Sequence, residues 1–272
     1  MMIRAGVIGY PISHSKSPYI HGYWLKKYGI DGEYKTYEIR PETLETDIHD
    51  LVHAGVSGFN VTLPHKQNMM GLCQTLTDEA RLIGAVNTVT VLKNGDLHGD
   101  NTDAFGFTQN LEKTIPGFDW TKKTATVIGA GGAARAVLYA LSQKAVPEVR
   151  ITNRTQESAE NLAQLYHANT FQWKDRDESV SGADLIINTT SLGMKGQNPL
   201  DINLSGIQEN SVVYDIVYTP LITPFLHQAQ NEGARIVTGI GMLLHQARPG
   251  FNAWFGHAPT VTDELENLIL GV

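Results

Sequence analysis

The hydrophobic and polar positions of the chain follow two patterns that alternate along most of its length. Short apolar runs bounded by turn residues predict buried strands, and apolar residues spaced three and four apart predict helices that pack on them. Strands are predicted at residues 3–9, 33–39, 58–63, 85–99 (a pair joined at Asn94-Gly95), 183–188, 212–217 and 235–237, and on either side of the helix that follows the turn "GAGG". Helices are predicted from Ser17-Pro18, as N-cap and first helical residue, over 41–54, 65–72, 77–83, 104–114, 155–167 and 261–270, and after Gly239.

The order of these elements predicts two α/β domains. Strands and helices that alternate along a chain form parallel sheets with right-handed crossovers. The pattern changes character at Lys122, so we expect one α/β domain over residues 1–104 and a second, Rossmann-like domain over 105–239, separated by a cleft. Residues 240–272 are expected to pack back onto the first domain, and Pro249-Gly250 to kink or split the helix after Gly239.

Composition narrows the function classes without choosing one. The 272 residues are 42% hydrophobic and 18% charged, as in an ordinary globular protein with a substantial core. The net charge of -7 argues against nucleic acid or an anionic membrane as a partner. The single cysteine fits a reducing compartment, and we expect a cytoplasmic protein because the sequence has neither a signal-peptide core nor an apolar run of ~18 residues.

The glycine-rich turn in "VIGAGGAA" indicates a dinucleotide site. Gly129 suits the tight turn, Gly131 allows the backbone to approach a pyrophosphate, and the small Ala134 allows the helix and the strand to pack closely. The helix N-terminus would then face the phosphates. Close packing alone also explains such a turn, but its place between a strand and a helix favours the cofactor.

The end of the next strand favours NADP over NAD. An NAD site usually has an acidic residue here, which accepts a hydrogen bond from the ribose 2′-hydroxyl. This chain has Asn153-Arg154-Thr155 instead, and an arginine can stack on adenine and pair with a 2′-phosphate. Thr155 can also cap the following helix.

Polar side chains gather at loop and strand ends of the first domain. They are Ser15, Ser17, Asn60, Thr62, Lys66, Asn87 and Asp103. Each has a simple structural interpretation: Ser17 and Asp103 suit helix N-caps, the asparagines can satisfy backbone groups, and Lys66 can be a solvated charge. Residue types alone leave these alternatives open.

Together, the motifs of the chain are similar to those of the shikimate dehydrogenase family. The matches are "SHSKSP", "NVTLPHK", "GAVNT", "GDNTDAFG", "GAGGAARA", "NRT", "NTTSLGM", "YDIVYTP" and "GIGMLLHQA", in the order and spacing of the family over nearly the whole chain. The resemblance implies a reversible, NADPH-dependent reduction of 3-dehydroshikimate to shikimate in aromatic amino acid biosynthesis. It also implies an N-terminal substrate domain, an NADP-binding domain, and a monomer or homodimer.

The resemblance also implies roles for individual residues. Lys66 and Asp103 are the implied catalytic pair. The implied substrate contacts are Ser15 and Ser17, on the carboxylate, together with Thr62, Lys66, Asn87, Asp103, Tyr218 and Gln246. The implied cofactor contacts are Asp78, Gly129, Ala130, Gly131, Gly132, Ala133, Asn153, Arg154, Thr155, Ile216 and Gly239. No metal-ligand spacing is evident, and His14, His65 and His245 are expected to shape the pocket.

Residue chemistry agrees with these roles. Hydride that reaches a ketone carbon leaves charge on the oxygen, which a protonated lysine can stabilise and then protonate. In the oxidation direction a neutral lysine takes the hydroxyl proton, and an adjacent carboxylate holds the ammonium form.

One departure from the family pattern keeps other functions open. The family often has a second cation after "NRT", but this chain has Ser158 there, so NADP selectivity would rest mainly on Arg154. A broader quinate/shikimate dehydrogenase that uses NAD or NADP is therefore one alternative. A non-catalytic NADP(H)-binding regulator is another, although it has no need of the Lys66–Asp103 pair. Methylene-folate dehydrogenase is a third, disfavoured by a serine pair suited to a small carboxylate.

Overall fold

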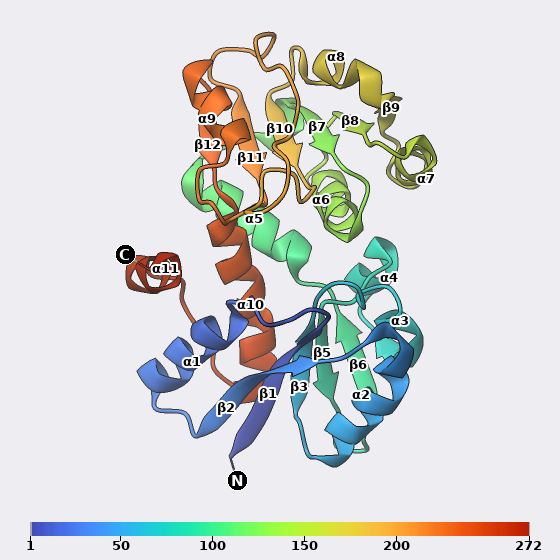
Figure 1. The fold of residues 1–272 in the computed structure, drawn as a ribbon, viewed down its shortest axis with the longest axis vertical. Helices are drawn as coiled ribbons and strands as arrows, with labels where there is room; N and C mark the ends of the chain where they lie inside the picture. Colours follow the sequence, from blue (N-terminus) through green and yellow to red (C-terminus); the bar gives the residue numbers. More distant parts are fainter. Residues whose placement is uncertain (1, 272) are drawn as a thin grey trace. The chain divides into compact units, whose positions relative to one another are not determined.

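The computed structural model describes residues 2–271, which divide into two compact units. Unit 1 contains the described residues up to Gly106 together with those from Leu244 onward, and unit 2 is Phe107–Leu243. Both divisions fall inside helices, α5 (Asp103–Thr114) and α10 (Gly239–Phe255), so each of these helices contributes residues to both units. The predicted α/β fold class is confirmed, with one sheet in each unit (Figure 1).

Unit 1 is built on a mixed sheet with the strand order β2-β1-β3-β5-β6-β4. Strands β2, β1 and β3 are parallel, and β5 is antiparallel to both β3 and β6. Its elements, besides parts of α5 and α10, are β1 (Ile3–Gly9), α1 (Ser17–Tyr28), β2 (Gly32–Glu38), a 3₁₀ turn (Pro41–Thr43), α2 (Leu44–His53), β3 (Gly58–Val61), α3 (Met69–Leu72), β4 (Thr75–Leu76), α4 (Asp78–Ile83), β5 (Thr88–Val91), β6 (Leu97–Asp100) and α11 (Asp263–Leu270).

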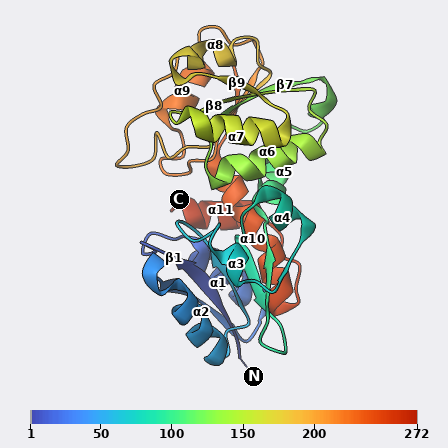
Figure 2. The same cartoon turned by 90° about the vertical axis from the view of Figure 1, so that its right-hand side faces the viewer.

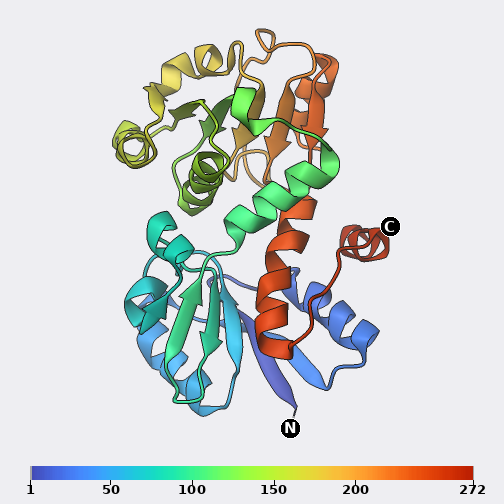
Figure 3. The same cartoon turned by 180° about the vertical axis from the view of Figure 1, so that it is seen from behind.

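The two faces of this sheet are covered by different helices. Side chains of α2, α3 and α4 pack with strand residues such as Phe59 and Val89 in one apolar cluster. An aromatic cluster joins α1, β2 and α10, where Trp24 meets Phe251 and Tyr34 meets Trp254. Figure 3 shows α10 running along the sheet, although α10 is far in sequence from the N-terminal strands of that sheet. The C-terminal segment is therefore part of unit 1.

Unit 2 is built on a parallel sheet with the order β12-β11-β10-β7-β8-β9. Numbered within the unit, this is the 3-2-1-4-5-6 order of a dinucleotide-binding fold. Helices α6 and α7 lie side by side on it (Figure 2). Its elements are a 3₁₀ turn (Trp120–Lys122), β7 (Thr124–Ile128), α6 (Gly132–Gln143), β8 (Glu148–Thr152), α7 (Gln156–Tyr166), β9 (Asn169–Phe171), a 3₁₀ turn (Trp173–Asp175), α8 (Arg176–Val180), β10 (Leu185–Asn188), β11 (Val212–Asp215), α9 (Pro224–Asn231) and β12 (Arg235–Val237).

The predicted strands and helices are present, with ends displaced by a few residues, but the prediction omitted four elements. These are β4, β9, α8 and α9. The first three have five residues or fewer, too short for a periodic pattern. Helix α9 did carry a start signal, because Thr223 caps it by accepting from the Leu226 amide and Pro224 is its first residue.

Of the kink or split predicted at Pro249, the split is wrong, because α10 is helical without interruption from Gly239 to Phe255. A proline inside a helix removes one hydrogen bond and costs roughly 3 kcal/mol. Buried side chains on both sides of it, Leu244 and Phe251 among them, oppose this cost by fixing both halves against unit 1.

Trp254 joins α10 to the sheet through a close approach that Gly58 allows. Its indole Nε1 donates to the Val89 carbonyl at 3.0 Å. A Cβ atom on Gly58 would collide with that indole nitrogen and with the same carbonyl. The missing side chain of Gly58 is thus what allows the indole to reach the backbone of β5.

We expect Gly58→Ala to lower the free energy of unfolding by about 1–3 kcal/mol, because the indole must be displaced from a packed core. Urea denaturation checks this. Gly22→Ala is the matched control: Gly22 lies in α1, is exposed, and a Cβ there meets nothing within 4 Å. It should raise the free energy of unfolding by roughly 0.5–1 kcal/mol, and equal effects of the two changes would contradict the packing argument.

Candidate functional site

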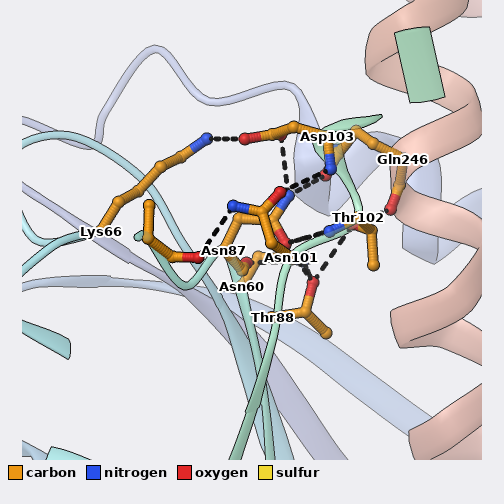
Figure 4. Close-up of polar contacts among 9 residues, drawn as sticks. Asn60, Lys66, Asn87, Thr88, Asn101, Thr102, Asp103 and Gln246 are labelled. Atoms are coloured by element: carbon orange, nitrogen blue, oxygen red, sulfur yellow. Dashed lines mark hydrogen bonds and ion pairs between the residues drawn. The ribbon is translucent and has the colours of Figure 1, made fainter. Parts of the chain in front are cut away.

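A buried polar network lies in unit 1 at the ends of several strands. Lys66 follows β3, Asn87 precedes β5, Asp103 begins α5, and Gln246 lies on α10. Figure 4 shows their side chains turned toward one another. The structure therefore brings together four predicted site residues that are spread over 180 positions of sequence.

Lys66 and Asp103 form the charged part of this network. Lys66 Nζ lies 2.5 Å from Asp103 Oδ2, and the two side chains are 19% and 8% exposed. Asp103 Oδ1 accepts from Asn87 Nδ2 at 2.8 Å, so each carboxylate oxygen has its own donor. A carboxylate this deeply buried is tolerated because both oxygens are paired.

The loop that carries Lys66 is held at several points. The Lys66 carbonyl accepts from the Val86 amide at 2.8 Å. The neighbouring His65 is fully buried, and its Nε2 donates to the Ile39 carbonyl at 2.7 Å. The lysine thus extends from a fixed backbone.

The orientation of the Asn87 amide follows from its partners. Its Oδ1 accepts from the Thr102 amide and from the Thr88 hydroxyl, both at 2.9 Å. Its Nδ2 must then face acceptors, which are Asp103 Oδ1 and, at 3.4 Å, Gln246 Oε1. The amide is therefore oriented as a donor to the carboxylate.

Two residues of the β6–α5 loop that were not singled out from the sequence complete the network. Asn101 Nδ2 donates to the Ala85 carbonyl at 2.9 Å, and its Oδ1 accepts from the Asp103 amide at 3.0 Å. The Thr102 hydroxyl donates to the Gln246 carbonyl at 2.8 Å. The interpretation of Asp103 as an N-cap is wrong, because it is the first helical residue and its carboxylate binds Lys66 and Asn87. The polar run "DNTD" was the available signal for both loop residues.

Beneath the network, buried aromatic side chains support Asn60. The Tyr34 hydroxyl donates to Asn60 Oδ1 at 2.7 Å, and Asn60 Nδ2 donates to Thr88 at 3.1 Å. His21 stacks on the Tyr34 ring with centroids 3.9 Å apart. Burial lowers the pKa of His21 to about 3, and burial raises the pKa of Tyr34 well above its usual range.

The remaining predicted substrate residues are placed as follows. Ser15 and Ser17 lie at the start of α1, where Ser15 Oγ accepts from the Ser17 amide at 3.3 Å. Ser17 is buried beside the Tyr34 hydroxyl, and Lys16, not Ser17, occupies the N-cap position, so the predicted cap is wrong. Thr62 is half-buried after β3, and Tyr218 belongs to unit 2.

The predicted cofactor residues of unit 2 lie at the carboxyl ends of its strands. Gly129 has a φ of +110°, which favours glycine, and a Cβ there would lie 2.6 Å from Thr189 Oγ1. Helix α6 begins at Gly132, and Gly131 at its N-cap position provides no side-chain hydrogen bond. Cβ atoms on Gly131 or Gly132 would meet nothing within 4 Å. Uncapped amides beside open space, with Ala130 and Ala133 adjacent, fit an anionic group.

The "NRT" segment lies beyond β8. Arg154 and Thr155 are exposed, and Asn153 Nδ2 donates to the Thr155 carbonyl at 3.0 Å. Thr155 occupies the N-cap position of α7 but makes no side-chain cap hydrogen bond there. Ile216 follows β11, Gly239 begins α10, and Asp78 belongs to unit 1, where it begins α4 and pairs with Arg81 at 3.6 Å.

Two family models match this chain, and both describe shikimate dehydrogenases or their quinate relatives. Residues 7–89 match the family described as "Shikimate dehydrogenase substrate binding domain", and residues 110–199 match "Shikimate / quinate 5-dehydrogenase". A shikimate dehydrogenase (NADP(+)) of Paramagnetospirillum magneticum is 50% identical over 268 residues, which cover 98% of this chain and 97% of that protein. No helix within residues 2–271 is long and apolar enough to cross a membrane.

Solved structures agree with this similarity. Shikimate 5-dehydrogenase from Thermus thermophilus, in complex with NADP(H) and shikimate, has a TM-score of 0.88 and 34% identity over 98% of each chain. Quinate dehydrogenase from Corynebacterium glutamicum, in complex with NAD, has a TM-score of 0.91 and 27% identity over 100% of this chain and 99% of that one.

The buried His21 gives a pH-dependent prediction. Its pKa is lower in the folded protein than the ordinary value of 6.5, so the unfolded chain binds a proton that the folded protein excludes. The contribution of His21 to the free energy of unfolding is therefore fully present above about pH 6.5 and is lost as the pH falls toward 3. We expect His21→Phe, which keeps the stack on Tyr34, to reduce the loss of unfolding free energy between pH 7 and pH 4.5. Urea denaturation at several pH values measures this, with the exposed His14→Phe as a control that should leave the slope unchanged.

Proposed function

The chain belongs to the shikimate dehydrogenase family, and from that premise we infer that it catalyses the reversible, NADPH-dependent reduction of 3-dehydroshikimate to shikimate. The observation that carries the chemistry is the ion pair of Lys66 and Asp103, 2.5 Å apart inside a buried hydrogen-bonded network. The reaction moves one hydride and one proton. The cofactor supplies the hydride, so the protein must supply and accept the proton.

In this proposal Lys66 is the group that transfers the proton. During reduction its ammonium donates to the oxygen that becomes negative as hydride arrives at the carbon. During oxidation the neutral amine accepts the hydroxyl proton. Asp103 holds the lysine in place at 2.5 Å and stabilises its charged form.

The other substrate residues provide hydrogen bonds suited to a small polyol acid. Asn87 and Gln246 present amide groups beside the Lys66–Asp103 pair, where they can meet ring hydroxyls. Ser15 and Ser17 are assigned to the carboxylate, and Thr62 and Tyr218 to further substrate contacts. Groups fixed by their own network lose little freedom when substrate binds.

The residues of unit 2 fit NADP. The uncapped start of α6 can hold the pyrophosphate, with Gly129, Ala130, Gly131, Gly132 and Ala133 as its backbone cradle. Arg154 is exposed and can pair with the 2′-phosphate, flanked by Asn153 and Thr155. Ile216, Gly239 and Asp78 are assigned to the rest of the cofactor.

The remaining assignments follow from the family. Residues 1–104 with 240–272 form the substrate domain, and residues 105–239 form the NADP-binding domain. We place the enzyme in the cytoplasm, consistent with a single cysteine, as a monomer or homodimer.

The function is tested by initial rates at 340 nm with shikimate or quinate, each with NADP or NAD. We expect strong activity with shikimate and NADP. Arg154→Ala should raise KM for NADP about tenfold or more and change KM for NAD little, because it removes the cation assigned to the 2′-phosphate.

Comparable wild-type rates with quinate or NAD would identify the broader enzyme that Ser158 leaves open. No turnover with intact NADPH binding would favour a regulator.

We expect Lys66→Ala to lower kcat by about 10²–10⁴, the usual contribution of a general acid–base group. NADPH binding, measured by fluorescence titration, should change little because Lys66 is assigned to the substrate. Lys35→Ala is the matched control, since Lys35 also pairs with a carboxylate of unit 1, Glu33 at 2.6 Å, but at the surface. Near-normal turnover in Lys66→Ala would refute the proton-transfer role.

A further inference from the structure

Asp103 of unit 1 is not the only buried carboxylate within residues 2–271. Asp215 of unit 2 is another, and the proposed function gives it no role. It ends β11 and is fully buried, next to Asn188 at the end of β10 in the sheet register. The carboxyl ends of these parallel strands form the edge at which open α/β sheets bind ligands. A buried acid at such an edge requires an explanation, because burial of an unpaired charge is costly.

Asp215 collects hydrogen bonds from three separate segments. Oδ1 accepts from Asn188 Nδ2 at 2.9 Å and from the Val217 amide at 3.0 Å. Oδ2 accepts from the Thr223 hydroxyl at 2.6 Å. The carboxylate thus ties together the end of β10, the turn after β11 and the start of α9.

Each of these partners orders a further part of its own segment. Asn188 Oδ1 accepts from the Thr190 amide at 3.0 Å and hydroxyl at 2.7 Å, which fixes the loop after β10. Thr223 Oγ1 accepts from the Leu226 amide at 3.3 Å and so caps α9. The Ile216 amide donates to the Asn188 carbonyl at 3.1 Å. The first two residues of the 216–218 turn are therefore fixed by Asn188 and Asp215.

We propose that Asp215 is a positioning residue for the proposed reaction: it sets the 216–218 turn, and with it Ile216 against the cofactor and Tyr218 against the substrate. The proposal rests on the proposed function, which assigns those two contacts. Asp215 itself touches neither ligand; it acts through the Val217 amide and the Thr223 hydroxyl.

The protonation state of the carboxyl group decides how strong these three bonds are. Within residues 2–271, the atoms that face it are all donors, on Asn188, Val217 and Thr223, and no charged side chain contributes to its titration. Burial raises the pKa of Asp215 to about 6, while those hydrogen bonds oppose the rise. A proton on Oδ2 would reverse the bond to Thr223, whose hydroxyl would then accept, so a charge-assisted bond is replaced by a weaker neutral one.

Asp215→Asn tests the proposal because it keeps Oδ1 as an acceptor and replaces Oδ2 by a donor. We expect KM for NADP and the dissociation constant for NADPH to rise about tenfold at pH 7.5, since a bond to a charged group is lost. Below about pH 6 the wild type should approach the variant. The cofactor's 2′-phosphate titrates in this range too, but it contributes equally to both proteins, so their difference isolates Asp215.

Thr223 provides a second test that does not depend on how Asp215→Asn folds. Thr223→Val removes the donor to Oδ2, so the pKa of Asp215 should rise and the low-pH loss of NADPH binding should move to higher pH, whereas Thr223→Ser should match wild type. Asp184→Asn is the control: Asp184 accepts from the Thr124 amide at 2.9 Å, but just before β10, at the opposite end of the sheet, and its loss should leave KM unchanged.

The outcomes separate this inference from the proposed function. Kinetic constants and a pH profile within twofold of wild type in Asp215→Asn and Thr223→Val, even with altered thermal stability, would overturn the positioning role. A wild type that binds NADPH but does not oxidise shikimate would overturn the proposed function, and the effect of Asp215 on NADPH binding would still be decided by the titrations.

Discussion

The Asp103 carboxylate imposes the main constraint on unit 1, because a buried charge requires a donor for each oxygen. Lys66 and Asn87 provide these donors. Asn87 can donate to Asp103 only while its own oxygen faces Thr88 and Thr102. The hydrogen bonds that the carboxylate requires therefore also fix the start of β5 and the start of α5. The site is therefore a consequence of how several strand ends satisfy one buried acid.

Unit 2 also buries a carboxylate, that of Asp215, but its donors are of a different kind, and this difference separates a group suited to proton transfer from one that supports the fold. Asp103 has a cation among its donors, and that cation has a proton to transfer. Asp215 has only an amide side chain, a backbone amide and a hydroxyl, none of which can release a proton near neutral pH. The first arrangement suits acid–base catalysis, whereas the second holds loops in place.

Sequence patterns located the strand ends and the glycine turn because both depend on local spacing, and the family motifs added Lys66 and Asp103 as a pair. The residues that support this pair could not be predicted from the sequence. Tyr34 lies 26 positions before Asn60 and has the appearance of an ordinary aromatic residue in a strand, so only the folded sheet reveals its hydrogen bond. Strand β9 was missed because three residues carry no period. Its pairing with β8 comes from tertiary structure.

Pro249 illustrates how the fold can override a local rule and why its position is tolerated. A proline there has no N–H to donate to the carbonyl four residues earlier, that of His245. The next carbonyl, that of Gln246, accepts from the Thr102 hydroxyl, so a contact from outside the helix holds this turn of α10 against the β6–α5 loop. The side chain of Gln246 faces Asn87 from the same turn. The weakened stretch of helix is thus the stretch that the polar network itself secures.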